Sequence, residues 1–126
     1  MQIVRTVSLR PARLMALLVA VGVALGACAA APTAADRLTA DQVRQTFVDR
    51  EWTQGTGTFM FARDGNWRYV DSRTNVSGTY QMADDGTICA ITAGTGLRTC
   101  YTFFRDGSGY QYLHDRSGRY WPATPR

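Results

Sequence analysis

Two cysteines, Cys89 and Cys100, are the residues whose spacing in this chain indicates the clearest chemistry. The segment Ala93-Gly94-Thr95-Gly96 lies midway between them and is typical of a turn. A chain that reverses at Gly94 and Thr95 places the two cysteines opposite one another on neighbouring strands, at the Cα spacing that a disulfide requires. We therefore expect a structural disulfide. A redox or metal site is the alternative, but the spacing is not C-x-x-C and the chain has one histidine.

A third cysteine, Cys28, ends the sequence Leu25-Gly26-Ala27-Cys28. It follows an arginine-bearing, acid-free segment over 1–13 and an apolar run over 14–25 that is too short to span a bilayer. This arrangement resembles the lipobox signal of bacterial lipoproteins, in which the cysteine sulfur carries a diacylglyceryl group. The resemblance implies removal of residues 1–27 and lipidation of Cys28. An ordinary signal cleaved after Ala-x-Ala is the alternative, and it leaves Cys28 as a thiol.

The cellular location and the net charge of the processed chain follow from the same resemblance. Ala29 is not the aspartate that favours retention in the inner membrane, so we expect an outer-membrane lipid anchor facing the periplasm. The net charge of +4 includes three signal arginines and falls to +1 without them. No basic run occurs in residues 28–126, so neither pI nor charge indicates a nucleic-acid partner.

Candidate catalytic and metal-binding residues are few. His114, the single histidine, stands beside Asp115 and could act as a base, but no motif marks a nucleophile for it. We expect it to be a solvated residue at a strand end. The remaining acids of note precede glycines, where aspartate is favoured by turn geometry: Asp64, Asp84, Asp85 and Asp106. We therefore expect no catalytic residue, no metal site and no cofactor.

Aromatic residues are the other candidates for function. Most of them alternate with polar residues in strand-like segments, so the simplest expectation is that they fill a core. Some could instead form an exposed or cavity-lining cluster that binds a partner or an amphipathic ligand. The candidate binding aromatics are Trp67, Tyr69, Tyr110, Tyr112 and Trp121.

The elements that would position these residues are one helix and a series of short strands. Thr39 and Gln42 form a capping box, so a helix is expected from there to about Asp49 or Arg50, with Leu38 stapled onto Val43. Beyond residue 51 the hydrophobic period becomes two and Asp-Gly or Ser-Gly turns recur at about ten-residue intervals, which predicts an antiparallel meander. Seven strands are expected, over 58–63, 67–70, 76–82, 87–93, 98–105, 110–113 and 119–121.

Seven strands of this size cannot cover two faces as an open sheet, so we expect the meander to curl into a small barrel. The expected fold is therefore mainly β, with one short amino-terminal helix over an opening or face. Residues 1–27 would be the signal, 28–37 a lipidated tether and 38–126 one domain.

The pattern over residues 38–115 resembles a family of small exported proteobacterial proteins of unknown function. The segments that carry it are LTADQVRQTF, a D-G-x-W hairpin at 64–67, V-S-G-T-Y at 76–80 and the paired-cysteine hairpin. The resemblance implies no activity or site. The expected architecture is also similar to calycin-like barrels, which hold apolar ligands.

Together these observations predict a lipid-anchored, non-catalytic envelope protein. A protein-binding or inhibitor-type module is the first expectation, and a calycin-like binder of a small apolar ligand is the alternative. The first predicts aromatics on an open face, and the second predicts aromatics around a cavity. An enzyme that uses His114 is the third and least favoured class.

Overall fold

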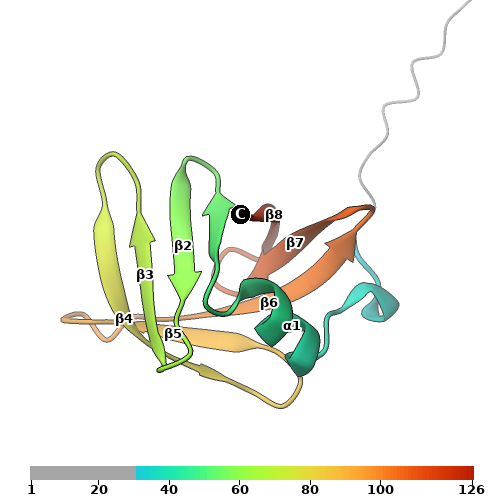
Figure 1. Ribbon diagram of the computed structural model, residues 1–126, viewed down its shortest axis with the longest axis horizontal. Coiled ribbons are helices and arrows are strands. Elements are labelled where there is room, and N and C mark those ends of the chain that lie inside the picture. The colour runs from blue at the N-terminus through green and yellow to red at the C-terminus, as the bar shows by residue number, and fades with distance from the viewer. Residues whose placement is uncertain (1–30) are drawn as a thin grey trace, which may run out of the picture.

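The computed structural model describes residues 31–126, and in this part of the chain eight antiparallel strands form a closed barrel with one short helix before them (Figure 1). The 3-10 helix η1 (Ala34–Asp36) and the helix α1 (Ala40–Phe47) come first. The strands are β1 (Glu51–Gln54), β2 (Gly57–Phe61), β3 (Asn66–Val70), β4 (Asn75–Met82), β5 (Ile88–Thr92), β6 (Arg98–Asp106), β7 (Gly109–His114) and β8 (Arg119–Pro125).

The predicted meander is confirmed, but it has eight strands instead of seven. The unpredicted strand is β1, which has four residues and one buried position, Trp52. Each strand pairs with the next in sequence, and β1 pairs with β8 to close the barrel. The closing seam is short: its register pairs are Trp52 with Pro125 and Thr53 with Thr124.

The helix α1 begins as predicted and ends earlier than predicted. The Thr39 amide donates to Gln42 Oε1 at 2.9 Å, and the Gln42 amide donates to Thr39 Oγ1 at 3.3 Å, which is the expected capping box. The helix ends at Phe47 because the next residue, Val48, is in extended backbone with a ψ of 137°, and Asp49, with a φ of 58°, then turns the chain into β1. The Asp49 amide donates to the Phe61 carbonyl at 2.8 Å, so the turn is fixed to β2.

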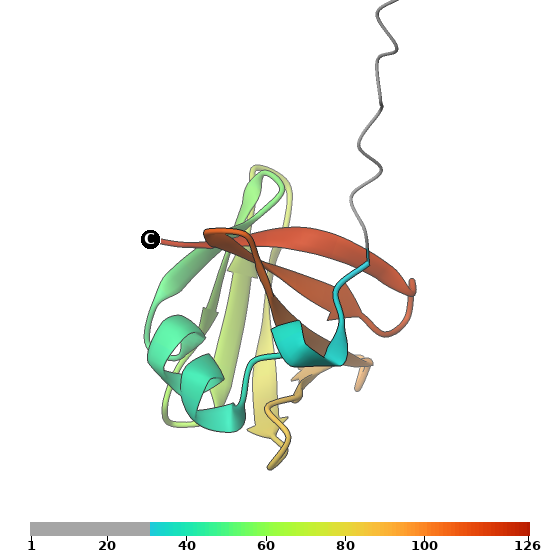
Figure 2. The ribbon, with the colours of Figure 1, turned by 90° about the vertical axis from the view of Figure 1, so that its right-hand side faces the viewer.

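The helix covers one opening of the barrel with its apolar face (Figure 2). Val43 and Phe47 on this face, and Leu38 just before it, are buried. The Phe47 ring stacks on Phe103 with centroids 4.3 Å apart and meets the edge of Tyr110 at 5.4 Å. Burying an aromatic ring of this kind stabilises the fold by about 2 kcal/mol, so the helix is part of the core.

The interior of the barrel is filled by aromatic side chains. Trp52 is fully buried at its centre, stacked on Phe59 with centroids 4.9 Å apart and in edge contact with Phe103 and Tyr112. Period-two alternation along each strand directs these rings inward. The expectation that most aromatics form a core is therefore confirmed.

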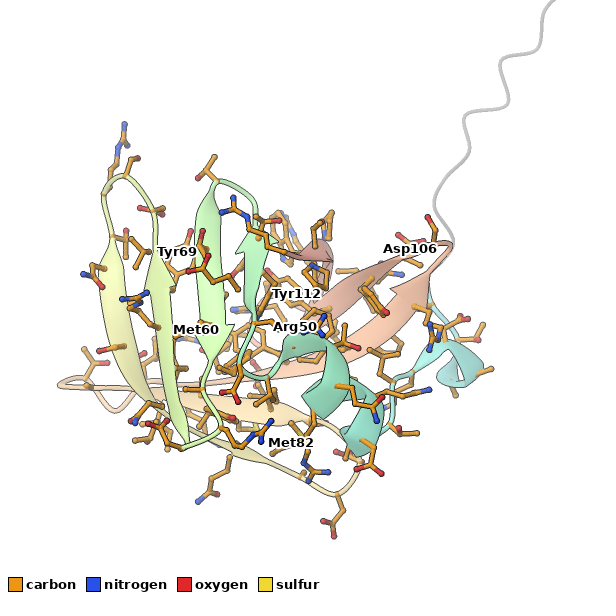
Figure 3. All side chains as sticks on the ribbon, in the orientation of Figure 1. Arg50, Met60, Tyr69, Met82, Asp106 and Tyr112 are labelled. Carbon is orange, nitrogen blue, oxygen red and sulfur yellow. A yellow bond between two sulfur atoms is a disulfide. The ribbon has the colours of Figure 1, made fainter. Side chains whose placement is uncertain are left out.

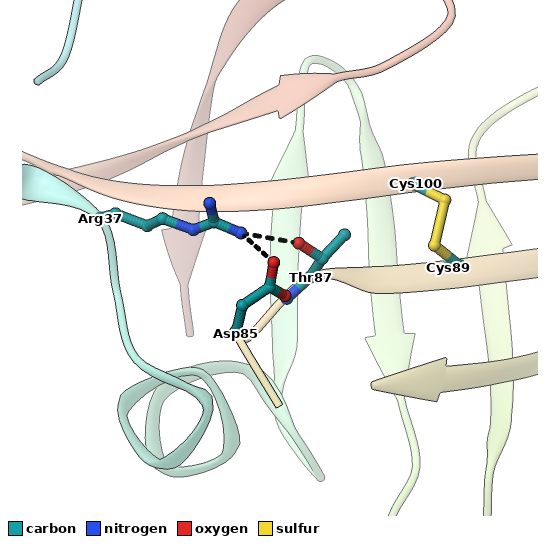
Figure 4. A network of polar contacts seen from close by, with 5 residues as sticks. All are labelled: Arg37, Asp85, Thr87, Cys89 and Cys100. Carbon is teal, nitrogen blue, oxygen red and sulfur yellow. Dashed lines mark hydrogen bonds and ion pairs between the residues drawn. A yellow bond between two sulfur atoms is a disulfide. The ribbon is translucent and has the colours of Figure 1, made fainter. Parts of the chain in front are cut away.

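The segment before the helix is held on the barrel by Arg37. Its Nη2 lies 2.8 Å from Asp85 Oδ2 and 2.9 Å from Thr87 Oγ1, which joins the segment to the turn between β4 and β5 (Figure 4). The Leu38 amide donates to the Phe103 carbonyl at 2.9 Å. The predicted tether over 28–37 thus ends in residues that contact the barrel, while the predicted signal and Cys28 lie outside the described residues.

The predicted disulfide is present and joins β5 to β6 (Figure 4). Cys89 and Cys100 are direct register partners with Cα atoms 4.0 Å apart, and the hairpin turns at Ala93 to Gly96 as expected. The Cys100 amide donates away from β5, to Asp115 Oδ1 at 2.9 Å. The pair is therefore of the non-hydrogen-bonded kind, in which side chains approach most closely. Between residues 31 and 126 no helix has the length and apolar character needed to cross a membrane.

Candidate binding site at the uncovered opening of the barrel

The barrel opening that α1 does not cover is a shallow cup of about 300 Å³. Position along each strand decides which residues reach it: on β6, Phe103 contacts Phe47 of the helix, whereas Tyr101, two residues away on the same face, lines the cup. The cup is lined by Gln54, Phe59, Trp67, Tyr69, Val76 and Tyr101.

The Tyr69 side chain, labelled in Figure 3, forms one wall of the cup. Gly57 makes room for it. A Cβ atom at Gly57 would collide with the hydroxyl end of the Tyr69 ring. The Tyr69 hydroxyl donates to Asp71 Oδ2 at 2.9 Å, and Asp71 Oδ1 accepts from the Arg73 and Thr74 amides at 2.8 and 2.7 Å. A glycine and a turn carboxylate thus hold this ring in place.

These contacts fix the protonation states at the wall. The Arg73 amide, followed by the Tyr69 hydroxyl, lowers the pKa of Asp71 below its ordinary value. Burial, followed by the nearby Asp71 carboxylate, raises the pKa of Tyr69. At neutral pH the wall therefore presents a neutral phenol whose proton is directed at a carboxylate.

The fully buried Tyr112 ring, labelled in Figure 3, lies beneath the cup, with its centroid 5.5 Å from that of Tyr101 in the lining. Its hydroxyl has no hydrogen-bond partner among the described residues, and the same is true of the Trp52 indole nitrogen. Burial raises the pKa of Tyr112, and Tyr101 and Tyr69 raise it further. The nearby Gln54 side chain lowers the pKa of Tyr112, although the two side chains do not meet the geometry of a hydrogen bond.

Tyr101 completes the aromatic lining. Burial, with a smaller effect from Asp115, raises the pKa of Tyr101 to about 12. The ring meets the edge of His114 at 5.7 Å and the edge of Phe59 at 5.6 Å. The cup is therefore an uncharged aromatic surface with hydroxyl and amide groups, suited to apolar or aromatic groups with one polar atom.

Trp67 is held at its place in the cup from behind. Its indole nitrogen donates to the Ile91 carbonyl at 3.1 Å, across β4. The crossing is possible because Gly78 has no side chain: a Cβ there would collide with the Ile91 carbonyl. Trp67 is 6% exposed, so only a small part of it reaches the cup.

The structure separates the five candidate aromatics. Trp67 and Tyr69 line the cup, and Tyr112 lies beneath it. Tyr110 is half-buried at the opposite end of the barrel, against Phe47. Trp121 is 42% exposed on β8. The five therefore do not form one exposed surface.

Four of the cup residues were outside the predicted set for identifiable reasons. Phe59 alternates like a core position and is almost fully buried. Gln54 belongs to the strand that the sequence did not reveal. Val76 and Tyr101 follow the same period-two alternation as many core positions, so their place at the opening depends on strand register. The signal that could have found Tyr101 is its direct pairing with His114, a strand-end residue.

Among the described contacts, no hydrogen bond joins the side chains of His114 and Asp115. His114 Nδ1 accepts from the Ser117 amide at 3.2 Å, as part of the turn between β7 and β8. Asp115 Oδ1 instead accepts from the Cys100 amide. The turn role expected of the acids is confirmed for Asp64 and Asp85, which accept from amides two residues ahead at 3.0 Å.

Within residues 31–126, no three histidine, cysteine or acidic side chains are grouped so that they could hold a metal ion. No family model, curated protein or solved structure matches this chain. The resemblance to small exported proteins therefore stays a prediction.

Proposed function

We propose that this protein is a lipid-anchored, non-catalytic module of the cell envelope that binds a protein, in the manner of an inhibitor or assembly accessory, and that the cup receives one side chain of the partner. The observation that carries the proposal is the shape of the opening. It is an open aromatic cup of about 300 Å³ above an interior that is filled with rings.

The depth of the cup favours a protein partner over an enclosed ligand. Its volume lies at the lower limit of small-molecule pockets, which bury most of their ligand. Trp52 and Tyr112, both fully buried, prevent a ligand from entering further. A cup of this size suits one inserted side chain, and tryptophan and tyrosine are the residues most often found at such anchoring points.

The disulfide supports an extracytoplasmic location, because structural disulfides persist in oxidising compartments. The lipid on Cys28 and an outer-membrane position facing the periplasm are the finer part of the proposal. Labelling with a radioactive fatty acid tests it: the native chain should be labelled and the Cys28→Ser variant should not. Equal labelling of both proteins would contradict the proposed anchor.

Site-specific photo-cross-linking tests the binding role of the cup. A photoreactive phenylalanine analogue replaces Gln54, which lines the cup, or Gln81, which is exposed on β4. We expect a discrete envelope protein to be cross-linked from position 54 and not from position 81. The same products from both positions, or none from position 54, would contradict the proposal.

A small apolar ligand is the second candidate function, and one observation favours it. The Tyr112 hydroxyl is buried below the cup without a partner among the described residues, and a ligand atom at the floor of the cup could pair with it after a small movement of Gln54. The native, non-reducing intact mass of the exported Cys28→Ser protein separates the two functions. A retained adduct of metabolite size supports the ligand, and a bare monomer supports the protein partner.

A further inference from the structure

A second hollow lies beside β8, and we call it the β8 groove. Its volume is about 480 Å³. Tyr120 and Trp121 line it and are 39% and 42% exposed, which is unusual for rings of this size. The full lining is Ala31, Pro32, Asp106, Gln111, Arg119, Tyr120, Trp121 and Pro122.

Trp121 is exposed because the barrel closes incompletely at this point. It is the register partner of the fully buried Tyr112. On its other side, however, β1 pairs with β8 through Pro125 and Thr124, and the pairing does not extend to Trp121. The middle of β8 therefore has no described neighbour on that edge.

This strand edge is poorly suited to pairing with a strand from another protein. The Arg126 amide donates to the Glu51 carbonyl at 2.9 Å, so Arg126 faces β1, and by alternation Pro122 and Tyr120 face the same edge. A proline nitrogen cannot donate to an added strand, and proline at such an edge blocks strand addition. The exposed aromatics here consequently need a partner that does not use backbone hydrogen bonds.

The position of the first described residues, Ala31 and Pro32, indicates what that partner is. Ala31 and Pro32 line the β8 groove, and Figure 2 shows the chain reaching the barrel beside the last strands. Cys28 is three residues before Ala31. Three residues span about 10 Å when fully extended. A lipid on Cys28 therefore holds the bilayer surface within about 10 Å of the groove.

The chemistry of the groove matches the headgroup layer of a membrane. Tyrosine and tryptophan concentrate there because each combines an apolar ring with one polar group. Arg119 in the groove offers a guanidinium to lipid phosphates, and exposed Arg116 lies in the turn before β8. Asp106 is the opposing charge in the lining, so the attraction depends on the rings more than on net charge.

We propose that the β8 groove is the membrane-facing surface of the protein, with Tyr120 and Trp121 seated in the headgroup layer of the leaflet that holds the lipid on Cys28. The inference rests on the lipid anchor of the proposed function. It means that the barrel is held against the bilayer in one orientation and does not rotate freely on a tether.

Tryptophan fluorescence provides the test, because Trp52 and Trp67 are buried and Trp121 is the exposed one of the chain's three tryptophans. Full-length lipidated protein is reconstituted into phosphatidylethanolamine–phosphatidylglycerol vesicles with or without brominated acyl chains. The Trp121→Phe variant isolates the Trp121 signal by difference, and Leu97→Ala, an exposed apolar position on another hairpin, is the matched control.

We expect the Trp121 emission to shift to shorter wavelength on reconstitution. Brominated vesicles should quench at least half of the Trp121 emission intensity, and the quenching should be the same in Leu97→Ala. An intact mass without lipid on Cys28 would overturn the anchor and this inference together. A lipidated protein whose Trp121 emission is equal in both kinds of vesicle would overturn this inference alone.

Discussion

Replacing Gly57 by alanine should reshape the cup without breaking the barrel. The added Cβ would collide with the outer end of the Tyr69 ring, which is the flexible end of a side chain and can move. The ring then leaves its place on Phe59, where the centroids are 5.5 Å apart, and the Tyr69 hydroxyl leaves Asp71. Gly57 itself is in extended backbone, which alanine adopts without strain.

The expected free energies follow from burial. A fully buried aromatic ring contributes about 2 kcal/mol, and Tyr69 is half-buried, so displacing it costs about 1 kcal/mol. Glycine to alanine at an unstrained position stabilises by about 0.5 kcal/mol through the unfolded state. Gly57→Ala should therefore lower the free energy of unfolding by about 0.5 kcal/mol in the native chain and raise it by about 0.5 kcal/mol in the Tyr69→Ala chain.

Urea unfolding of the native chain, Gly57→Ala, Tyr69→Ala and the double variant measures the effect. Carboxyl NMR of Asp71 supplies an independent readout. Because the Tyr69 hydroxyl lowers the pKa of Asp71, displacing the ring should move that pKa up, toward its ordinary value. An equal effect of Gly57→Ala in both backgrounds, with an unchanged Asp71 pKa, would refute the assignment of Gly57 as the space that Tyr69 occupies.

Three further predictions concern the core. Replacing Cys89 and Cys100 by alanine together should lower the free energy of unfolding by about 3 kcal/mol, because the disulfide closes a short loop; a change below about 1 kcal/mol in urea unfolding would contradict this. Tyr112→Phe should leave that free energy unchanged or raise it by about 1 kcal/mol, since it removes a buried hydroxyl without a described partner; a clear loss would reveal a missing partner. Because the pKa of Tyr101 is raised to about 12 in the folded state, stability should hold up to about pH 10 and then fall by about 2 to 3 kcal/mol as the pH rises to 12. Tyr112, whose pKa is also raised by burial, adds to the alkaline loss in the same range, so Tyr101→Phe should reduce the loss in pH-dependent unfolding by about 2 kcal/mol without abolishing it. An identical loss in the variant would assign all of it to other groups.

Local signals predicted much of the fold. The capping box placed the start of α1, and the Asp-Gly turns and the cysteine spacing placed most strands and the disulfide register. The strand β1 was missed because four residues with one buried position carry too little periodicity. The helix end was predicted too late because Val48 and Asp49 continue the helical sequence pattern, whereas the backbone becomes extended at Val48 and turns at Asp49.

The site was harder to predict than the fold. Period two shows which residues share a face of a strand, but it does not show how deep each residue lies along the barrel. Tyr110 and Tyr112 are two residues apart on one face, yet the first contacts the helix and the second lies below the cup. Trp121 shares the face of Tyr112 and is exposed because the closing seam stops short of it. Depth and closure are properties of register between distant strands.

The most direct test of the cup as the recognition site is the yield of cross-linked partner from position 54 when the wall of the cup is changed. The yield should fall severalfold in Gly57→Ala and in Tyr69→Ala, while both proteins stay folded, and should stay the same in the exposed control Leu97→Ala. An unchanged yield in both wall variants would contradict the proposal that the cup holds the partner.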